Sequence, residues 1–188
     1  MTAPLAELFD SEPVPSMVER AREGDPTAWS ELYETHAGRL VLWLRQLPTG
    51  DASVDAEDIA MEAWTLAASR MADFHGDDGD FGGWLFTIAR NHAINARRKT
   101  ARRATYPTSE IADSADTALT ASAIVESEEA VRLAVAALPT REGEVIACSE
   151  VIGLDISTTA RILGMSQAGV RVARSRGLSR LRKLGWGV

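Results

Sequence analysis

Hydrophobic positions recur at helical spacing in several segments, and no strand-like alternation lasts longer than a few residues, so the pattern predicts an all-α fold. The first helix is expected to begin at Pro26, with Asp25 as its N-cap, and to continue up to Pro48. Its predicted inward stripe consists of Trp29, Leu32, Tyr33, Leu40, Val41, Trp43, Leu44 and Leu47.

A second helix follows the turn after Pro48, with Asp51 or Ser53 as its cap. Its predicted buried stripe is Ala56, Ile59, Ala60, Ala63, Leu66, Ala67 and Met71. Residues 73–80 are rich in glycine and acid and predict a loop, followed by a long helix over residues 81–103. The apolar side of that helix is Trp84, Leu85, Ile88, Ala89 and Ala93.

The C-terminal part predicts four more helices. The first spans residues 128–138 and is ended by Pro139, and the next is capped by Thr140 and ends near Gly153. A short helix capped by Asp155 or Ser157 then runs to Leu163. A turn over residues 164–166 leads to the last helix, which Ser166 caps, and this is the outline of a helix-turn-helix. The inward stripe of the last helix is Val170, Ala173, Gly177, Leu181 and Leu184.

Composition shifts divide the chain into two domains joined by a flexible linker. Residues 1–16 hold three prolines, several acids and no clear period, so we expect a disordered or loosely docked tail. Residues 104–127 carry acids but no basic residue, and they form the predicted acidic linker. The composition of this linker allows a short helix within it. The two domains are therefore expected at residues 17–103 and 128–188.

Charge is segregated along the chain. The net charge is -7, yet residues 161–183 carry seven basic residues, and no acid follows Asp155. A second basic cluster, at residues 97–103, exceeds what the helix dipole at a C-terminus favours. Both clusters predict a polyanionic partner. The preference for arginine over lysine suits phosphates and guanine edges, and a GC-rich genome explains it equally well.

Several functional classes lack their signatures. The only cysteine is Cys148, which we expect to be a small buried hydrophobe. His36, His75 and His92 share no metal-ligand spacing, and no phosphate loop, nucleophile elbow or HExxH helix occurs. We therefore expect no enzyme activity, cofactor, metal or small-molecule substrate. The sequence shows neither a long apolar run nor a leader, so we expect no membrane contact. A reducing cytoplasm is the expected location.

The inward stripe of the last helix turns its adjoining face outward. We expect Arg171 and Arg176 to meet guanine edges or nearby phosphates in a major groove. The plainer interpretation, a solvated basic face, agrees less well with the turn, the caps and the stripe together. The residues of this helix predicted to contact DNA are Gln167, Ala168, Arg171, Val172, Arg174, Ser175 and Arg176.

Two groups of motifs resemble the domains of bacterial sigma factors. In the C-terminal part they are Leu138-Pro-Thr-Arg-Glu-Gly-Glu-Val145, Ala160-Arg-Ile-Leu-Gly-Met-Ser166 and Val170-Arg171. In the N-terminal part they are Ala28-Trp-Ser-Glu-Leu-Tyr33, Asp55-Ala-Glu-Asp-Ile59 and residues 81–98. Two such domains and a short linker resemble the extracytoplasmic-function (ECF) class.

This resemblance implies a role for each segment. The acidic second helix would dock on core RNA polymerase through Asp55, Glu57, Asp58, Met61 and Glu62. The loop and the long helix would hold the melted −10 element of promoter DNA, and the last helix would read the −35 element as duplex. The linker would run through the RNA path of the polymerase. The residues implied at the −10 element are Phe74, His75, Asn91, His92, Asn95, Arg97, Arg98, Arg102 and Arg103.

The resemblance also implies an anti-sigma protein as a regulator. Some positions depart from the family pattern, among them Met61, Asn95, the Thr158-Thr159 pair and Arg174, and these departures concern promoter sequence more than architecture. Two other functions stay open: a self-standing helix-turn-helix transcriptional regulator, and a sigma-like adaptor without promoter activity. The first would need a dimerisation helix, and none is evident in the sequence.

Overall fold

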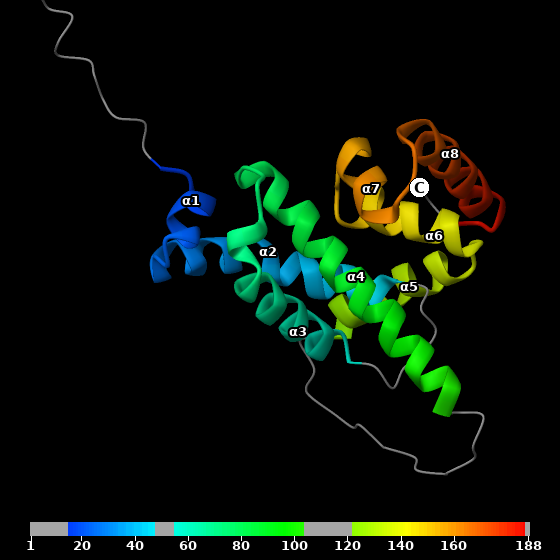
Figure 1. The fold of residues 1–188 in the computed structure, drawn as a ribbon. Coiled ribbons are helices and arrows are strands. Elements are labelled where there is room, and N and C mark those ends of the chain that lie inside the picture. Colours follow the sequence, from blue (N-terminus) through cyan, green and yellow to red (C-terminus); the bar gives the residue numbers. More distant parts are fainter. Residues whose placement is uncertain (1–14, 48–54, 104–121, 187–188) are drawn as a thin grey trace, which may run out of the picture.

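The computed structural model describes residues 15–47, 55–103 and 122–186, and within these ranges all regular elements are helices. Figure 1 shows them as two groups in contact, α1–α4 in the N-terminal domain and α5–α8 in the C-terminal domain. The tail over residues 1–14 and the linker over residues 104–121 lie outside the described residues, as do Asp51 and Ser53, the two predicted caps. No helix in the described part is long and apolar enough to cross a membrane.

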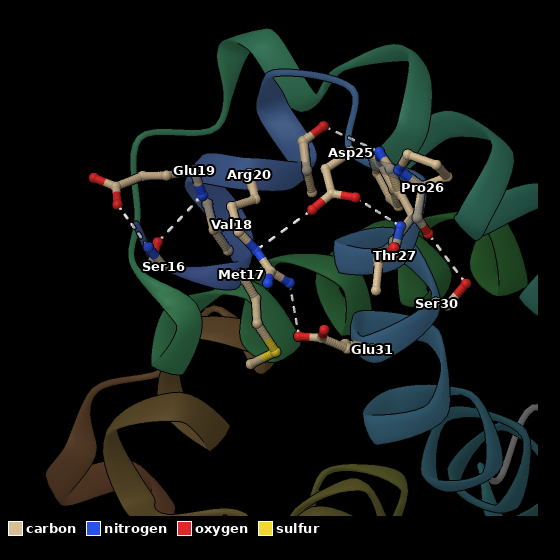
Figure 2. A network of polar contacts seen from close by, with 12 residues as sticks. Ser16, Met17, Val18, Glu19, Arg20, Asp25, Pro26, Thr27, Ser30 and Glu31 are labelled. Carbon is tan, nitrogen blue, oxygen red and sulfur yellow. Dashed lines mark hydrogen bonds and ion pairs between the residues drawn. The ribbon is translucent and has the colours of Figure 1, made fainter. Parts of the chain in front are cut away.

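The first element, α1 (Met17–Arg22), was not anticipated from the hydrophobic pattern. Ser16 and Glu19 form a capping box at its start, with each side chain accepting from the backbone N–H of the other residue (Figure 2). Asp78 adds two contacts by accepting from the backbone N–H groups of Met17 and Val18 at 3.1 and 2.8 Å. A Ser-x-x-Glu signature was therefore present at the edge of the segment assigned to the tail.

Helix α2 (Pro26–Gln46) begins as predicted, since Asp25 accepts from the N–H of Thr27 and Pro26 is the first helical residue (Figure 2). Helix α3 (Ala56–Ser69) is capped by Asp55 and not by Asp51 or Ser53. The 3₁₀ turn η2 (Met71–Asp73) follows it and buries Met71. Tyr33 was wrongly placed in the core, because half of its side chain is exposed, where its ring packs on Trp64.

Helix α4 (Asp78–Arg103) begins three residues earlier than the pattern predicted, because Asp77 accepts from the N–H of Asp80 and supplies a cap inside the expected loop. Its buried Phe81 is surrounded by aromatic rings from α2, α3, the preceding loop and α4 itself, with ring centroids 5.6–6.5 Å away. This aromatic core fixes the direction of α4 relative to α2 and α3. The rings are those of Trp29, His36, Trp64, Phe74 and Trp84.

Helix α5 (Ser122–Ala136) begins six residues before the predicted start, inside the segment assigned to the linker. Helix α6 (Thr140–Ile146) has Pro139 at its N-cap position with no side-chain hydrogen bond, so Thr140 is the first helical residue and not the cap. The helix continues as a π-helical turn, η3 (Ala147–Val151), before Gly153 at φ 72°. Cys148 in this turn is fully buried, as predicted.

The helix-turn-helix is confirmed in detail. Asp155 caps α7 (Ile156–Leu163), Gly164 adopts the left-handed conformation at φ 61°, and Ser166 caps α8 (Gln167–Lys183). Only glycine takes that φ without strain, and this explains the sharp turn. The predicted stripe of α8 is buried except for Leu184, which is exposed because the helix ends one residue before it.

The two domains pack against each other, with α7 lying along the N-terminal half of α4 (Figure 1). The buried residues of both domains form one continuous cluster that includes Trp43 of α2 and Cys148 of η3. A two-domain sequence pattern does not predict such docking, because side chains that face another domain look like ordinary surface or core positions.

Candidate DNA and polymerase interfaces

The outward face of α8 is set by short local signals. Val170, Ala173 and Leu181 anchor the helix on α6 and α7, and Gly177 comes so close to α6 that a Cβ there would lie 2.8 Å from Ile146 Cγ1. The residues that this packing leaves exposed on the predicted reading face are Gln167, Ala168, Arg171, Val172, Ser175 and Arg176. The first turn of the helix contains the small residues Ala168 and Gly169, and Arg171 and Arg176 follow on the exposed face. This arrangement matches a helix that enters a major groove.

Arg174 differs from its neighbours on α8. Its guanidinium is paired with Glu150 of η3, with contacts of 2.5 and 3.3 Å to the two carboxylate oxygens. The hydrogen bond from Arg174 holds the pKa of Glu150 below its usual range. Arg174 is thus committed to an intramolecular partner, so its predicted contact with DNA would require exchange of Glu150 for a phosphate. Nothing in the sequence pattern pointed to Glu150.

The middle of α4 carries three of the predicted −10 residues on one face. Asn91, Asn95 and Arg98 are exposed and follow one another at i, i+4 and i+7. His75, in the loop before α4, is exposed as well. Amide edges on one face can hydrogen-bond extruded bases, and a cation beyond them can hold the backbone.

Phe74 does not fit its predicted role of stacking on a base. Its side chain is 5% exposed, because the ring stacks on Trp84 at a centroid distance of 4.7 Å and meets Phe81 edge-on. The ring therefore belongs to the aromatic core. Trp84, expected in the buried stripe of α4, is half-buried and covers Phe74 from the outer side.

His92 is half-buried and lies between two predicted surfaces. Its Nδ1 is 3.0 Å from Glu62 Oε2 on α3, so a residue expected at the melted DNA contacts a residue expected at the polymerase. This contact joins α3 and α4 at their outer faces and could not be read from sequence.

The basic end of α4 is helical as predicted, up to Arg103. Figure 1 shows its last turns extending beyond the packed helices. The side chains of Arg97, Arg102 and Arg103 lie outside the described residues, and Arg98 is exposed.

The acidic residues of α3 form an exposed face around Met61, whose side chain is 65% exposed. Asp55 caps the helix by accepting from the N–H of Glu57, and Glu57 is also bound by Arg45 of α2. We call the exposed residues Asp55, Glu57, Asp58, Met61 and Glu62 the acidic face. Met61 is a large apolar side chain exposed among carboxylates, at the position where the sequence resemblance implies contact with the polymerase.

Comparison with known proteins agrees with this geometry. Residues 32–103 match the family description "Sigma-70 region 2", and residues 128–181 match "Sigma-70, region 4". The ECF RNA polymerase sigma factor ShbA of Streptomyces griseus is 31% identical over 90% of this chain and 93% of its own length. BldN of Streptomyces coelicolor, also an ECF sigma factor, is 28% identical over 93% of this chain and 67% of its own.

Two solved structures share the fold. CnrH in complex with the cytosolic domain of CnrY has a TM-score of 0.67 at 22% identity, covering 89% of this chain and 94% of that one. The sigma factor RpoE in complex with the anti-sigma factor NepR from Bartonella quintana has a TM-score of 0.58 at 20% identity, covering 82% and 96%.

A region 2 domain followed by a region 4 domain, the second with its helix-turn-helix exposed, defines a sigma factor. Sigma factors are non-catalytic subunits that bind core RNA polymerase and direct it to promoters. Regions 2 and 4 are both matched, and ShbA is 31% identical over nearly its whole length, so this chain belongs to the ECF RNA polymerase sigma factors.

Proposed function

We propose that the chain recognises its promoter through two separate faces and meets the polymerase through a third. The face of α8 around Arg171 and Arg176 reads the −35 duplex, the face of α4 around Asn91 and Asn95 holds the melted −10 strand, and the acidic face of α3 docks on core polymerase. The observation that supports this most directly is the α8 face, where both arginines are exposed beside small residues on a helix anchored from behind.

The face of α4 suits a melted −10 strand. Exposed amides at Asn91 and Asn95 suit single-stranded bases, and the basic end of α4 suits the phosphates next to them. The polymerase supplies all the chemistry. The cytoplasm is the location where such a subunit meets its enzyme, and an anti-sigma protein that covers one or both domains is the proposed regulator.

The decisive test is transcription by purified core polymerase over a random promoter library. With this protein added, we expect start sites that share a −10 and a −35 element. A self-standing regulator would instead bind DNA tightly without polymerase, and an adaptor would bind core enzyme without producing start sites. Either result would contradict the proposal.

A narrower test addresses the α8 face alone and separates DNA recognition from polymerase binding. Arg171→Ala with Arg176→Ala should weaken binding to the −35 element by about 1–3 kcal/mol for each base that the removed guanidinium groups read, and core binding should persist. Arg132→Ala, at an exposed position of α5, is the matched control because it removes a cation that is on neither DNA face. Equal impairment of promoter selection and core binding in the double variant would indicate misfolding instead.

A further inference from the structure

The loop before α4 is held in place on both sides of the exposed His75. Phe74, which precedes His75, is fixed at three points: its ring stacks on Trp84, its N–H donates to the first carbonyl of η2, and its own carbonyl accepts from Arg22. Gly76, which follows His75, has no room for a side chain, because a Cβ there would lie 2.5 Å from Phe74 Cζ. The exposed imidazole therefore stands on a backbone that its two neighbours hold in place.

Two contacts of this loop are made by α1. Arg22, the last residue of α1, donates from Nη2 to the carbonyl oxygen of Phe74 at 2.6 Å. Asp78, the first residue of α4, accepts from the backbone N–H groups of Met17 and Val18 at 3.1 and 2.8 Å. The two contacts lie at opposite ends of α1, so this helix bridges the loop from residue 74 to residue 78. We call this pair of contacts the α1 brace.

The carboxylate of Asp78 completes the N-terminus of α1. The first N–H groups of a helix have no acceptor within the helix. The Ser16 side chain accepts from the N–H of Glu19, and Asp78 accepts from the two N–H groups before it. A negative charge at this end is also favoured by the helix dipole. Because a helix of six residues is too short to be stable by itself, α1 depends on its contacts with the loop and with α2.

On its other side α1 is anchored to α2. Val18 and Ala21 are buried, and Trp29 of α2 donates from Nε1 to the carbonyl of Ala21 at 3.0 Å. Arg20 points toward α2 and binds Glu31 there at 2.8 Å (Figure 2). The short helix is thus fixed to the long one, and the α1 brace connects the loop to that support.

A loop that is ordered before it binds loses little further conformational freedom on binding, so its affinity is higher than that of a mobile loop. We propose that α1 positions His75 for the melted −10 strand, with Arg22 and Asp78 as positioning residues. This inference rests on the proposed function for the role of His75 alone. Both residues act through the loop backbone: Arg22 is engaged by a carbonyl, and a carboxylate such as that of Asp78 repels phosphate.

The first test uses the free, full-length chain and measures amide hydrogen exchange by NMR. In Arg22→Gln, the N–H groups of Phe74 and Val18 should both exchange about tenfold faster, because loss of one end of the brace lets the loop open locally. Arg20→Gln is the matched control, since it removes an arginine of the same helix that binds α2 and not the loop. It should leave the Phe74 rate unchanged. An unchanged rate at Phe74 in Arg22→Gln would overturn the brace.

The second test uses the holoenzyme and a single-stranded oligonucleotide that carries the −10 element recovered from the promoter library. Arg22→Gln and Asp78→Asn should each weaken binding of this oligonucleotide about fivefold, and Arg22→Lys should restore part of the loss. Binding to −35 duplex and to core polymerase should stay unchanged, as should all three affinities in Arg20→Gln. Equal weakening of −10 and −35 binding would overturn a positioning role and indicate general destabilisation.

A double-mutant cycle shows whether Arg22 acts through His75. In a His75→Ala background, Arg22→Gln should weaken oligonucleotide binding by much less than fivefold, because the side chain that the brace positions is gone. Fully additive effects would overturn the positioning role. An unchanged affinity in His75→Ala alone would count against the proposed function of this loop, while the brace would still be judged by hydrogen exchange in the free protein.

Discussion

The two helices that carry the DNA faces, α4 and α8, obtain those faces in different ways. The face of α8 follows from its own sequence: Ser166 caps it, Val170 and Leu181 anchor it, and the exposed residues between them are what remains. The face of α4 is shaped by partners elsewhere in the chain, since His92 contacts Glu62 and Arg90 contacts Glu144. The exposed face of a short, capped recognition helix can therefore be predicted from its own sequence. The exposed face of a long central helix cannot, because distant residues also shape it.

This contrast predicts that α4 is the more sensitive helix to loss of a core side chain. Phe81→Ala removes the ring at the centre of the aromatic core, and we expect a loss of about 3–5 kcal/mol in the free energy of unfolding. Amide hydrogen exchange should show the loss in α2–α4 first. Phe81→Leu, which keeps most of the volume, should cost much less; equal costs for the two variants would contradict a packing role.

For α8 the sharpest probe is a glycine substitution with a matched partner. Gly177→Ala should destabilise the protein by about 1–3 kcal/mol, because its Cβ would lie 2.8 Å from Ile146 Cγ1 in the buried seam with α6. Gly38→Ala in α2 adds the same methyl group where nothing lies within 4 Å, so helix propensity should make it stabilising by about 0.5–1 kcal/mol. Thermal unfolding of the two variants should shift in opposite directions.

The same contrast explains which features the sequence predicted. The caps Asp25, Asp155 and Ser166 and the turn glycine Gly164 were predicted from a few neighbouring residues, and all four are confirmed. Local hydrogen-bonding chemistry decides such positions, so sequence suffices.

Errors occurred where tertiary contacts decide. Phe74 was expected at a base, but it packs between Trp84 and Phe81. Tyr33 was expected in the core and is half exposed, because helical spacing does not say how far a neighbouring helix reaches. The ion pairs of Arg45, Arg90 and Arg174 join elements far apart in sequence, so no local pattern contains them.

Substitution of the N-cap residues tests whether local hydrogen bonds specify the helix-turn-helix. Asp155→Ala should cost about 1 kcal/mol at neutral pH, and Ser166→Ala a similar amount. Hydrogen bonds from the Thr158 hydroxyl and backbone N–H hold the pKa of Asp155 below its usual value. The carboxylate therefore stabilises the folded state above its unfolded pKa, and this contribution disappears as the pH falls through the folded value.

The two caps should accordingly separate in acid. Denaturant unfolding measured at neutral pH and again below about pH 4 should show the cost of Asp155→Ala shrinking while that of Ser166→Ala stays constant. A constant cost for both would mean that the Asp155 carboxylate does not act as an ionised cap.

The smallest expected effect concerns Arg174, which an ion pair ties to Glu150 of another element. Glu150→Gln frees Arg174 from its ion pair, which should change stability by only a few tenths of a kcal/mol, because both side chains are partly exposed. The freed guanidinium can reach a phosphate, so the salt dependence of binding to −35 duplex should steepen by up to about one unit. Glu129→Gln, which breaks an exposed pair on α5, is the matched control and should leave the slope unchanged.

Because Arg174 lowers the pKa of Glu150, the pair stays intact as the pH falls and is lost only below the usual range of a glutamate. Mild acidification from pH 7 to about pH 6 should therefore not reproduce the substitution, and a slope that steepened there would point to another titrating group.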